Sequence, residues 1–190
     1  LCGEGHRIFL DLKFHDIPNT VAGAVLSASR LGVWMMNVHC LGGKEMLLRA
    51  KDALDSVDHK GNFGKPLLIG VTILTSHGEN DLSFIGLANK IDENVERLSM
   101  LAKDCGLDGV VASAHEAAMI RRNIPDQSFS IVTPGIRPLN ATLDDQTRVL
   151  TMAEAIRSGA DHVVVGRPIT RSADRIKAIE QILEGVEITD

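Results

Sequence analysis

The stretch Leu67-Leu68-Ile69-Gly70-Val71, which reads LLIGV, contains no polar side chain. Strands with one solvated face alternate apolar and polar residues, whereas parallel strands covered by helices are apolar nearly throughout. A second run of this kind, Val163-Val164-Val165, lies near the other end of the chain. The two runs therefore predict a parallel sheet that is covered by helices.

Apolar, β-branched runs alternate with helix-like segments along the whole chain. The apolar runs predict six strands, at residues 7–14, 34–40, 66–74, 109–113, 128–134 and 162–166. Segments with helical periodicity lie between or after them, at residues 20–31, 44–56, 91–105, 114–123, 151–158 and 172–183. Regular repetition of a strand and a helix indicates an α/β fold.

Two architectures fit this alternation, an open doubly wound sheet and a (β/α)8 barrel. No glycine-rich dinucleotide fingerprint follows any strand, which disfavours the open sheet. A barrel needs eight strands and typically ~250 residues, but this chain of 190 residues offers six strands. The first strand follows residues 1–6, LCGEGH, which resemble a helix end with its glycine cap. We therefore expect a single barrel domain over residues 1–190, with the first two βα units missing from this chain.

Composition argues against several other classes of protein. With 44% hydrophobic and 24% charged residues, the chain has the composition of a folded globular protein. The net charge of -5 and the absence of a dense Lys/Arg block argue against binding to nucleic acid. No apolar run is long enough to span a membrane and no signal peptide is evident, so we expect a cytoplasmic protein that does not bind membranes.

The first strand ends in a charged stretch, residues 11–20, DLKFHDIPNT. Catalytic groups of a barrel lie at the carboxyl ends of its strands. Side chains two residues apart point to the same face of a strand. We therefore expect Asp11 and Lys13 to project together into the barrel mouth. By the same alternation, Leu10 and Leu12 should pack outward under the helices.

An ordinary ion pair between Asp11 and Lys13 would produce the same spacing, and such pairs are common on protein surfaces. Charged groups beside strongly apolar residues are costly unless they are paired or used, which favours a functional site. Asp16 lies beyond the strand in the following loop, and Pro18 suits the first turn of the next helix.

Two other strand ends carry groups suited to an anion. Gly166 would let backbone N–H groups approach an anion, and Arg167 would bind it through two hydrogen bonds. An exposed arginine in a turn would have the same sequence. Arg137 and Gln146 belong to a long polar segment that would close over a ligand as a lid, or form a plain flexible loop.

Metal and thiol chemistry have little support in the sequence. The seven histidines form neither H-x-H nor H-E-x-x-H, so no metal site is predicted. His39 is expected to pack and hydrogen-bond at the barrel rim. Three widely spaced cysteines without C-x-x-C predict neither a disulfide framework nor a zinc site.

Six motifs occur in order along the chain: FLDLKFHDIPNTV, NVHCLGG, GVTILTS, CGLDGVVASAHE, VTPGIRP and VVVGRPIT. Together they resemble the bacterial-type orotidine 5'-phosphate decarboxylase family over essentially the whole chain. The resemblance implies a homodimeric (β/α)8 TIM barrel of the ribulose-phosphate-binding type. It also implies conversion of orotidine 5'-phosphate to UMP and CO2 in de novo pyrimidine synthesis, with no metal or organic cofactor.

The resemblance assigns a role to each candidate residue. Lys13 would be the proton donor of a Lys-Asp-Lys-Asp array in which Asp11 is the first aspartate and Asp16 the second. Asp16 would reach, together with Thr20, into the site of the neighbouring subunit. The remaining substrate-binding residues would be Thr75, which contacts the substrate, and the phosphate ligands Arg137, Gln146, Gly166 and Arg167.

Two residues of the family's site would precede Leu1: the other lysine of the array and an aspartate that binds the ribose. If the molecule began at Leu1, we would expect neither a closed barrel nor activity. A preceding segment of about two βα units is therefore expected.

Two alternatives stay open. Mg²⁺-dependent barrels such as 3-keto-L-gulonate-6-phosphate decarboxylase and hexulose-phosphate synthase share the D-x-K-x-x-D strand end, but they add a metal-ligating carboxylate. The runs HDIPNT and TPGIRP favour the orotidylate enzyme. The other alternative is a non-catalytic phosphate-ligand-binding fragment, which would bind UMP and release no CO2.

Overall fold

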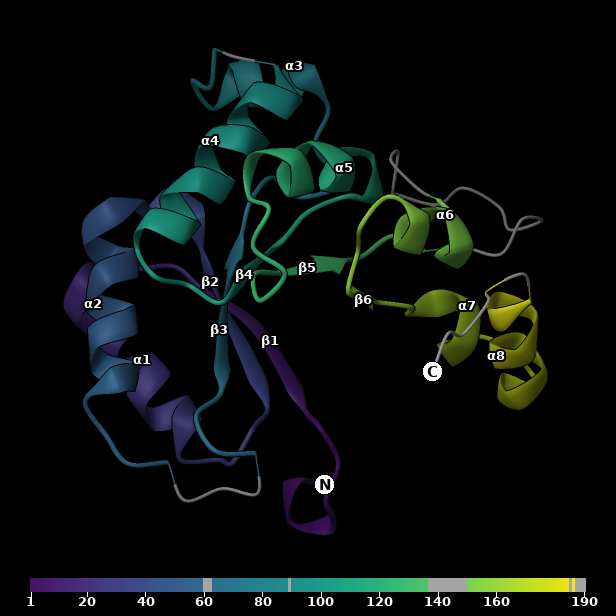
Figure 1. The fold of residues 1–190 in the computed structure, drawn as a ribbon, viewed down its shortest axis with the longest axis horizontal. Helices are drawn as coiled ribbons and strands as arrows, with labels where there is room; N and C mark the ends of the chain where they lie inside the picture. The colour runs from purple at the N-terminus through teal and green to yellow at the C-terminus, as the bar shows by residue number, and fades with distance from the viewer. Residues whose placement is uncertain (60–62, 89, 137–149, 185, 187–190) are drawn as a thin grey trace. The chain divides into compact units, whose positions relative to one another are not determined.

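The computed structural model describes residues 1–59, 63–88, 90–136, 150–184 and 186 (Figure 1). The chain divides into two compact units. Unit 1 comprises Leu1–Thr72, Arg97–Val110 and Gln127–Phe129, and unit 2 comprises Ile73–Glu96, Val111–Asp126 and Ser130–Asp190.

The described residues contain the six strands that the sequence predicts. They are β1 (Phe9–Phe14), β2 (Met35–His39), β3 (Leu67–Val71), β4 (Gly109–Val111), β5 (Ser130–Thr133) and β6 (His162–Val163). Hydrogen bonding joins them in the order β1-β2-β3-β4-β5-β6. The pairs β1–β2, β2–β3 and β5–β6 are parallel, which confirms the α/β class and the parallel sheet. Each strand lies within its predicted range and is shorter, because the apolar runs continue into the loops after pairing stops.

All six predicted helices are present, with ends shifted by up to three residues. They are α1 (Pro18–Ser29), α2 (Gly43–Asp55), α4 (Ile91–Asp104), α5 (Ala114–Asn123), α6 (Met152–Arg157) and α8 (Arg175–Leu183). The 3-10 helix η1 (Cys2–Glu4), which ends at Gly5 with a left-handed φ of 86°, matches the helix end and glycine cap expected in residues 1–6. Three other short elements were not predicted: α3 (Glu79–Phe84), α7 (Arg167–Thr170) and the 3-10 helix η2 (Cys40–Gly42). Elements as short as these, three to six residues, show little helical periodicity.

In unit 1, helices α1 and α2 pack together on one side of strands β1, β2 and β3 (Figure 1). Val21, Val25 and Ala28 of α1 recur at helical spacing and are buried. Met35 and Met36 of β2 are buried as well. Burial stabilises the fold by about 1.5–3 kcal/mol for each large apolar side chain. The core of this unit thus holds the strands whose carboxyl ends carry the predicted site.

The loop from α4 into β4 shows how a helix is joined to the next strand. Gly106 has a left-handed φ of 74°, which ends the helix at little steric cost. Two residues later, the backbone N–H of Asp108 donates to the carbonyl of Leu68 over 2.9 Å. Two other loops repeat this geometry. In one, Gly32 has a positive φ and the N–H of Trp34 donates to the carbonyl of Ile8. In the other, Gly159 has a positive φ and the N–H of Asp161 donates to the carbonyl of Ile131.

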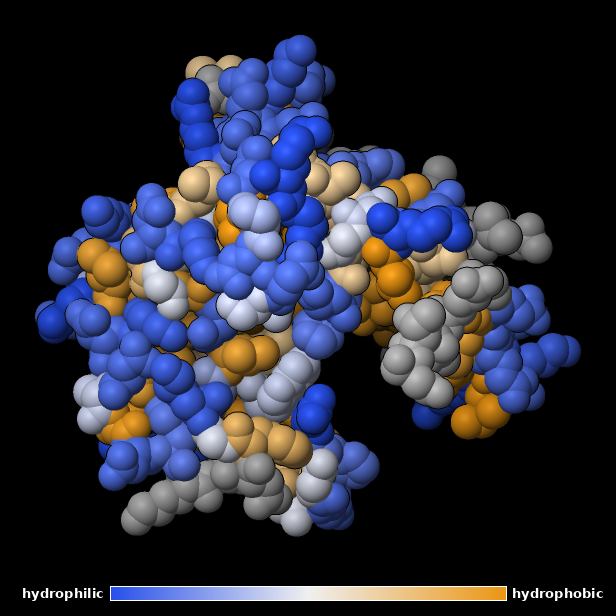
Figure 2. Space-filling view, viewed as in Figure 1, coloured by the Kyte–Doolittle hydropathy of each residue, from blue (hydrophilic) through white to orange (hydrophobic). Residues whose placement is uncertain are grey.

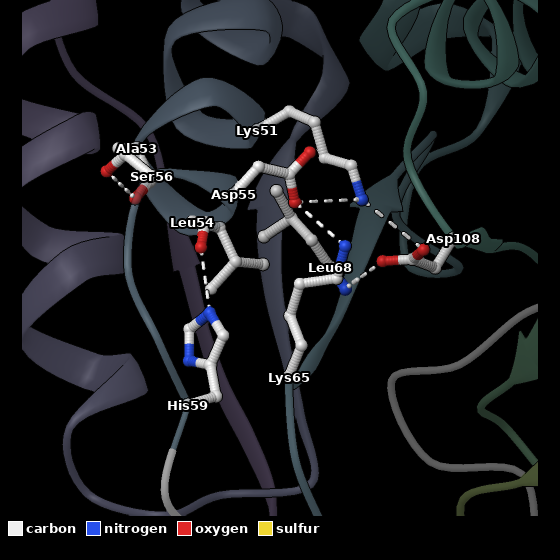
Figure 3. A network of polar contacts seen from close by, with 9 residues as sticks. All are labelled: Lys51, Ala53, Leu54, Asp55, Ser56, His59, Lys65, Leu68 and Asp108. Carbon is white, nitrogen blue, oxygen red and sulfur yellow. Dashed lines mark hydrogen bonds and ion pairs between the residues drawn. The ribbon is translucent and has the colours of Figure 1, made fainter.

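A network of ion pairs lies where β3 and β4 begin (Figure 3). Lys51 Nζ lies 3.4 Å from Asp108 and 3.8 Å from Asp55, and Lys65 Nζ lies 2.9 Å from Asp55. The second carboxylate oxygen of Asp108 accepts from the backbone N–H of Leu68 over 2.8 Å. The hydrogen bond to Asp55 is the largest cause of the raised pKa of Lys65. The amino ends of barrel strands typically serve stability, so we interpret this network as structural.

Unit 2 has a smaller core of its own. Its buried members are Ala114, Ile136, Ala155 and Ala160, and Leu150, Met152, Val163 and Val165 pack against them. Arg121 of α5 ties the unit together, because Nε donates to the carbonyl of Gly159 over 3.0 Å and the guanidinium pairs with Asp161. No helix in the described part of the chain is both long and apolar enough to cross a membrane.

Candidate functional site

Two charged side chains meet at the carboxyl end of β1. Lys13 Nζ lies 2.7 Å from Oδ1 of Asp11, so the two groups are adjacent, as predicted. Their side chains are 39% and 44% exposed. A pair with that much exposure contributes only about 0–1 kcal/mol to stability.

The backbone around Asp11 and Lys13 departs from regular strand geometry, so the two side chains do not meet through simple alternation along β1. The β1–β2 register shifts between Leu10 and Phe14, and Lys13 has a φ of 50°. It is the one non-glycine residue with positive φ among those the structure describes. Leu12 is 57% exposed, so the prediction that it packs outward under the helices is wrong. The register shift interrupts the side-chain alternation in this part of β1, which explains the error.

Asn37 of β2 completes this cluster, and the sequence analysis missed it. Its Nδ2 donates to Oδ1 of Asp11 over 2.6 Å, and its Oδ1 accepts from the backbone N–H of Lys13 over 2.7 Å. The side chain is fully buried. The available signal was an amide inside the apolar strand sequence MMNVH, since a buried polar group needs partners. We call Asp11, Lys13 and Asn37 the β1 cluster.

Two histidines lie at the ends of the same strands. The rings of His15 and His39 are stacked, with centroids 5.4 Å apart. Nδ1 of His39 accepts from the backbone N–H of Leu41 over 3.4 Å, which matches the predicted hydrogen bond at the strand end.

Asp16 and Thr20 follow β1, and both are exposed. Asp16 lies in the loop, as predicted, and its Oδ1 accepts from the backbone N–H of Ile17 over 2.6 Å. Thr20 is in the first turn of α1, where its N–H donates to the carbonyl of Ile17 over 3.0 Å. Pro18 is the first residue of that helix, also as predicted. Neither Asp16 nor Thr20 belongs to the β1 cluster.

The predicted substrate residues Thr75, Gly166 and Arg167 belong to unit 2. Thr75 follows β3 and is buried, with 8% of its surface exposed. Gly166 precedes α7, and a Cβ at this position would meet no atom within 4 Å, so there is open space beside it. Arg167 is the first residue of α7 and is half-buried. Arg137 and Gln146 lie outside the described residues.

The chemistry available to the β1 cluster is that of a fixed ammonium. The Lys13 ammonium carries a positive charge and can donate a proton. Its contact with Asp11, which also accepts from Asn37, restricts where the ammonium lies. Thiol chemistry is disfavoured, because burial raises the pKa of Cys40 to about 12. Within the described ranges, no group of three or more His, Cys, Asp or Glu side chains could hold a metal ion.

Comparison with known proteins gives consistent matches over nearly the whole chain. The model of the orotidine 5'-phosphate decarboxylase / HUMPS family matches residues 1–182. An orotidine 5'-phosphate decarboxylase of Hydrogenovibrio crunogenus is 53% identical over 182 residues, which is 96% of this chain and 75% of that protein. One of Coxiella burnetii is 52% identical, with the same coverage.

Solved structures agree with these matches. The crystal structure of orotidine 5'-phosphate decarboxylase from Lactobacillus acidophilus aligns with a TM-score of 0.80 and 38% identity, covering 95% of this chain and 75% of that one. The enzyme from Pyrococcus horikoshii aligns with a TM-score of 0.67 at 23% identity, over 94% of this chain and 73% of that one, a likeness of fold alone. The chain thus spans about three quarters of the length of the proteins it matches.

Proposed function

The chain belongs to the orotidine 5'-phosphate decarboxylase / HUMPS family, and we propose that it converts orotidine 5'-phosphate to UMP and CO2. It is then a carboxy-lyase of pyrimidine biosynthesis. The observation that carries the proposal is the contact between Lys13 and Asp11 at the carboxyl end of β1, in a chain about half identical to proteins of that name.

Lys13 acts as the proton donor in this proposal. Loss of CO2 from C6 of the pyrimidine leaves a carbanion, and the reaction uses no metal or organic cofactor to delocalise it. A fixed ammonium stabilises the developing charge and then delivers the proton to C6. The 2.7 Å contact supports a role for Asp11 in holding that ammonium in position.

The phosphate of the substrate is held by residues of unit 2. The open space beside Gly166 suits an anion, and Arg167 supplies the charge. Thr75 contacts the substrate. We assign Arg137 and Gln146, which lie outside the described residues, to phosphate binding as well, so that binding energy from the phosphate lowers the barrier at C6.

The active form is a cytoplasmic homodimer in this proposal. Asp16 and Thr20 are exposed, which suits side chains that serve the site of the neighbouring subunit. Asp16 is then the second aspartate of the Lys-Asp-Lys-Asp array. The partners are small molecules, orotidine 5'-phosphate and UMP, rather than nucleic acid or membrane.

We further propose that the six strands belong to one complete (β/α)8 TIM barrel of the ribulose-phosphate-binding type. Two more βα units, carrying the other lysine and the ribose-binding aspartate, complete the barrel upstream of Leu1. The TM-score of 0.80 with a longer decarboxylase supports this proposal. Apolar side chains exposed on α8, Ile176, Ile179 and Leu183, also support it, and Figure 2 shows hydrophobic surface around that helix.

The test is an absorbance assay of orotidine 5'-phosphate. It compares residues 1–190 with a longer chain extended at the N-terminus by two βα units. We expect turnover to UMP in the longer chain, insensitive to a metal chelator, and no turnover in the shorter one. Turnover abolished by chelator would favour the Mg²⁺-dependent relatives, and UMP binding without CO2 release from either chain would favour a non-catalytic protein.

A further inference from the structure

We propose that Asn37 is a positioning residue for the decarboxylation, because its amide holds Asp11 and the backbone of Lys13 in register. The inference rests on the proposed function, since it assigns a role next to the proton donor. Asn37 lies on β2, whereas the two groups that it contacts lie on β1.

The contacts use both ends of the amide. Nδ2 donates to Oδ1 of Asp11 over 2.6 Å, while Oδ1 of Asn37 accepts from the N–H of Lys13 over 2.7 Å. Asn37 is fully buried, so these bonds form in a medium where electrostatic attraction is strong. One side chain from a neighbouring strand thus determines where two positions of β1 lie.

The backbone of Lys13 needs such support. Its φ of 50° places a non-glycine residue in the left-handed region, which L-residues other than glycine rarely occupy. A conformation of this kind persists only where its surroundings stabilise it, and such conformations gather at functional sites. The register shift between Leu10 and Phe14 interrupts the regular ladder there. The amide oxygen of Asn37 supplies the acceptor for the Lys13 N–H at this point.

The carboxylate of Asp11 is oriented by the same residue. Its Oδ1 accepts from Asn37 on the buried side and from Lys13 Nζ over 2.7 Å on the exposed side. Asp11 and Lys13 are both about two-fifths exposed, so water would compete for their contact if the carboxylate were free to rotate. A neutral amide anchors the carboxylate without adding a charge that would compete with the lysine.

The test replaces Asn37 with leucine, which has a similar size and can make neither hydrogen bond. Val38→Ala is the matched control, because Val38 is the next residue of β2, is fully buried, and points away from the amide's partners by strand alternation. Both variants are made in the chain that turns over orotidine 5'-phosphate, and rates are normalised to folded protein.

We expect Asn37→Leu to lower kcat by roughly 10- to 100-fold. A displacement of a catalytic group by about 1 Å can reduce the rate by up to about 100-fold. KM should change little, because the lost interactions favour the transition state. Hydrogen exchange at the Lys13 amide should also become faster. Val38→Ala should leave kcat and the Lys13 amide unchanged.

Wild-type kcat in folded Asn37→Leu, or equal losses of kcat in the two variants, would overturn the inference. An unchanged exchange rate at the Lys13 amide would overturn it as well, and this measurement needs no activity. These outcomes are separable from failure of the proposed function, which would appear as no release of CO2 from orotidine 5'-phosphate by the unsubstituted longer chain.

Discussion

At the scale of single residues, Gly70 shows how tightly β3 is packed. A Cβ at this position would lie 2.5 Å from Sγ of Cys40, 3.1 Å from Cδ2 of Leu107 and 3.2 Å from Cβ of Ala102. The Cys40 side chain is fully buried, and Ala102 belongs to a packed helix, so neither can move aside freely. The absence of a side chain at Gly70 is therefore a packing requirement.

We expect Gly70→Ala to lower the free energy of unfolding by about 1–3 kcal/mol, because it overpacks this core. Gly23→Ala is the control: Gly23 lies inside α1, and a Cβ there would meet nothing within 4 Å. That substitution should stabilise the protein by about 0.5–1 kcal/mol, since alanine favours a helix. Urea titration measures both, and a stabilised Gly70→Ala variant would contradict the packing described.

The β1 cluster shows which residue-scale features can be predicted from sequence. The spacing of Asp11 and Lys13 predicted that the two side chains meet, and they do. The exposure of Leu12 and the role of Asn37 could not be predicted in the same way. Both depend on the register between β1 and β2, which a local pattern in either strand does not contain.

At the scale of elements, helix α6 of unit 2 begins with a capping box. Thr151 and Glu154 form a capping box: Oγ1 of Thr151 accepts from the N–H of Glu154, and Oε2 of Glu154 accepts from the N–H of Thr151 over 2.8 Å. Hydrogen bonds from Thr151 lower the pKa of Glu154 below its ordinary 4.5. The ionised glutamate thus stabilises the start of the helix.

Glu154→Gln is expected to destabilise the protein at neutral pH and to have less effect in acid. The folded-state pKa of Glu154 is lowered, so the contribution of its ionised form is fully present above 4.5 and is lost as the pH falls through the folded-state value. Urea titrations of both proteins, at neutral pH and well below 4.5, measure the difference. A gap in stability that widens in acid would contradict this assignment.

The lengths of the elements decided which of them the sequence could predict. Helices such as α4 and α5 were predicted to within one residue, because they are long enough to show a helical period. The four-residue helix α7 follows directly from the loop at Gly166, so its sequence was interpreted as part of that loop. The predicted strands are longer than the observed ones where apolar residues continue beyond the last hydrogen-bonded pair of the sheet.

At the scale of the whole molecule, the alternation of strands and helices predicted the α/β class. Parallel pairing followed from runs such as LLIGV at residues 67–71, whose side chains need cover on both faces. The matches to longer decarboxylases are consistent with the same arrangement. Each of the two compact units has a core of its own.

The central claim is that Lys13 donates the proton in decarboxylation. The chain offers a matched control, because Lys65 forms a similar pair with Asp55 over 2.9 Å, with both side chains 44% exposed, at the start of β3. Each lysine is replaced by alanine in the longer chain, and turnover of orotidine 5'-phosphate is followed by absorbance.

We predict that Lys13→Ala lowers kcat by about 10²- to 10⁴-fold, the range expected for loss of a general acid, while the circular dichroism spectrum is unchanged. Lys65→Ala should keep the turnover of the unmodified protein. Near-normal turnover in Lys13→Ala, or an equal loss in both variants, would contradict the account.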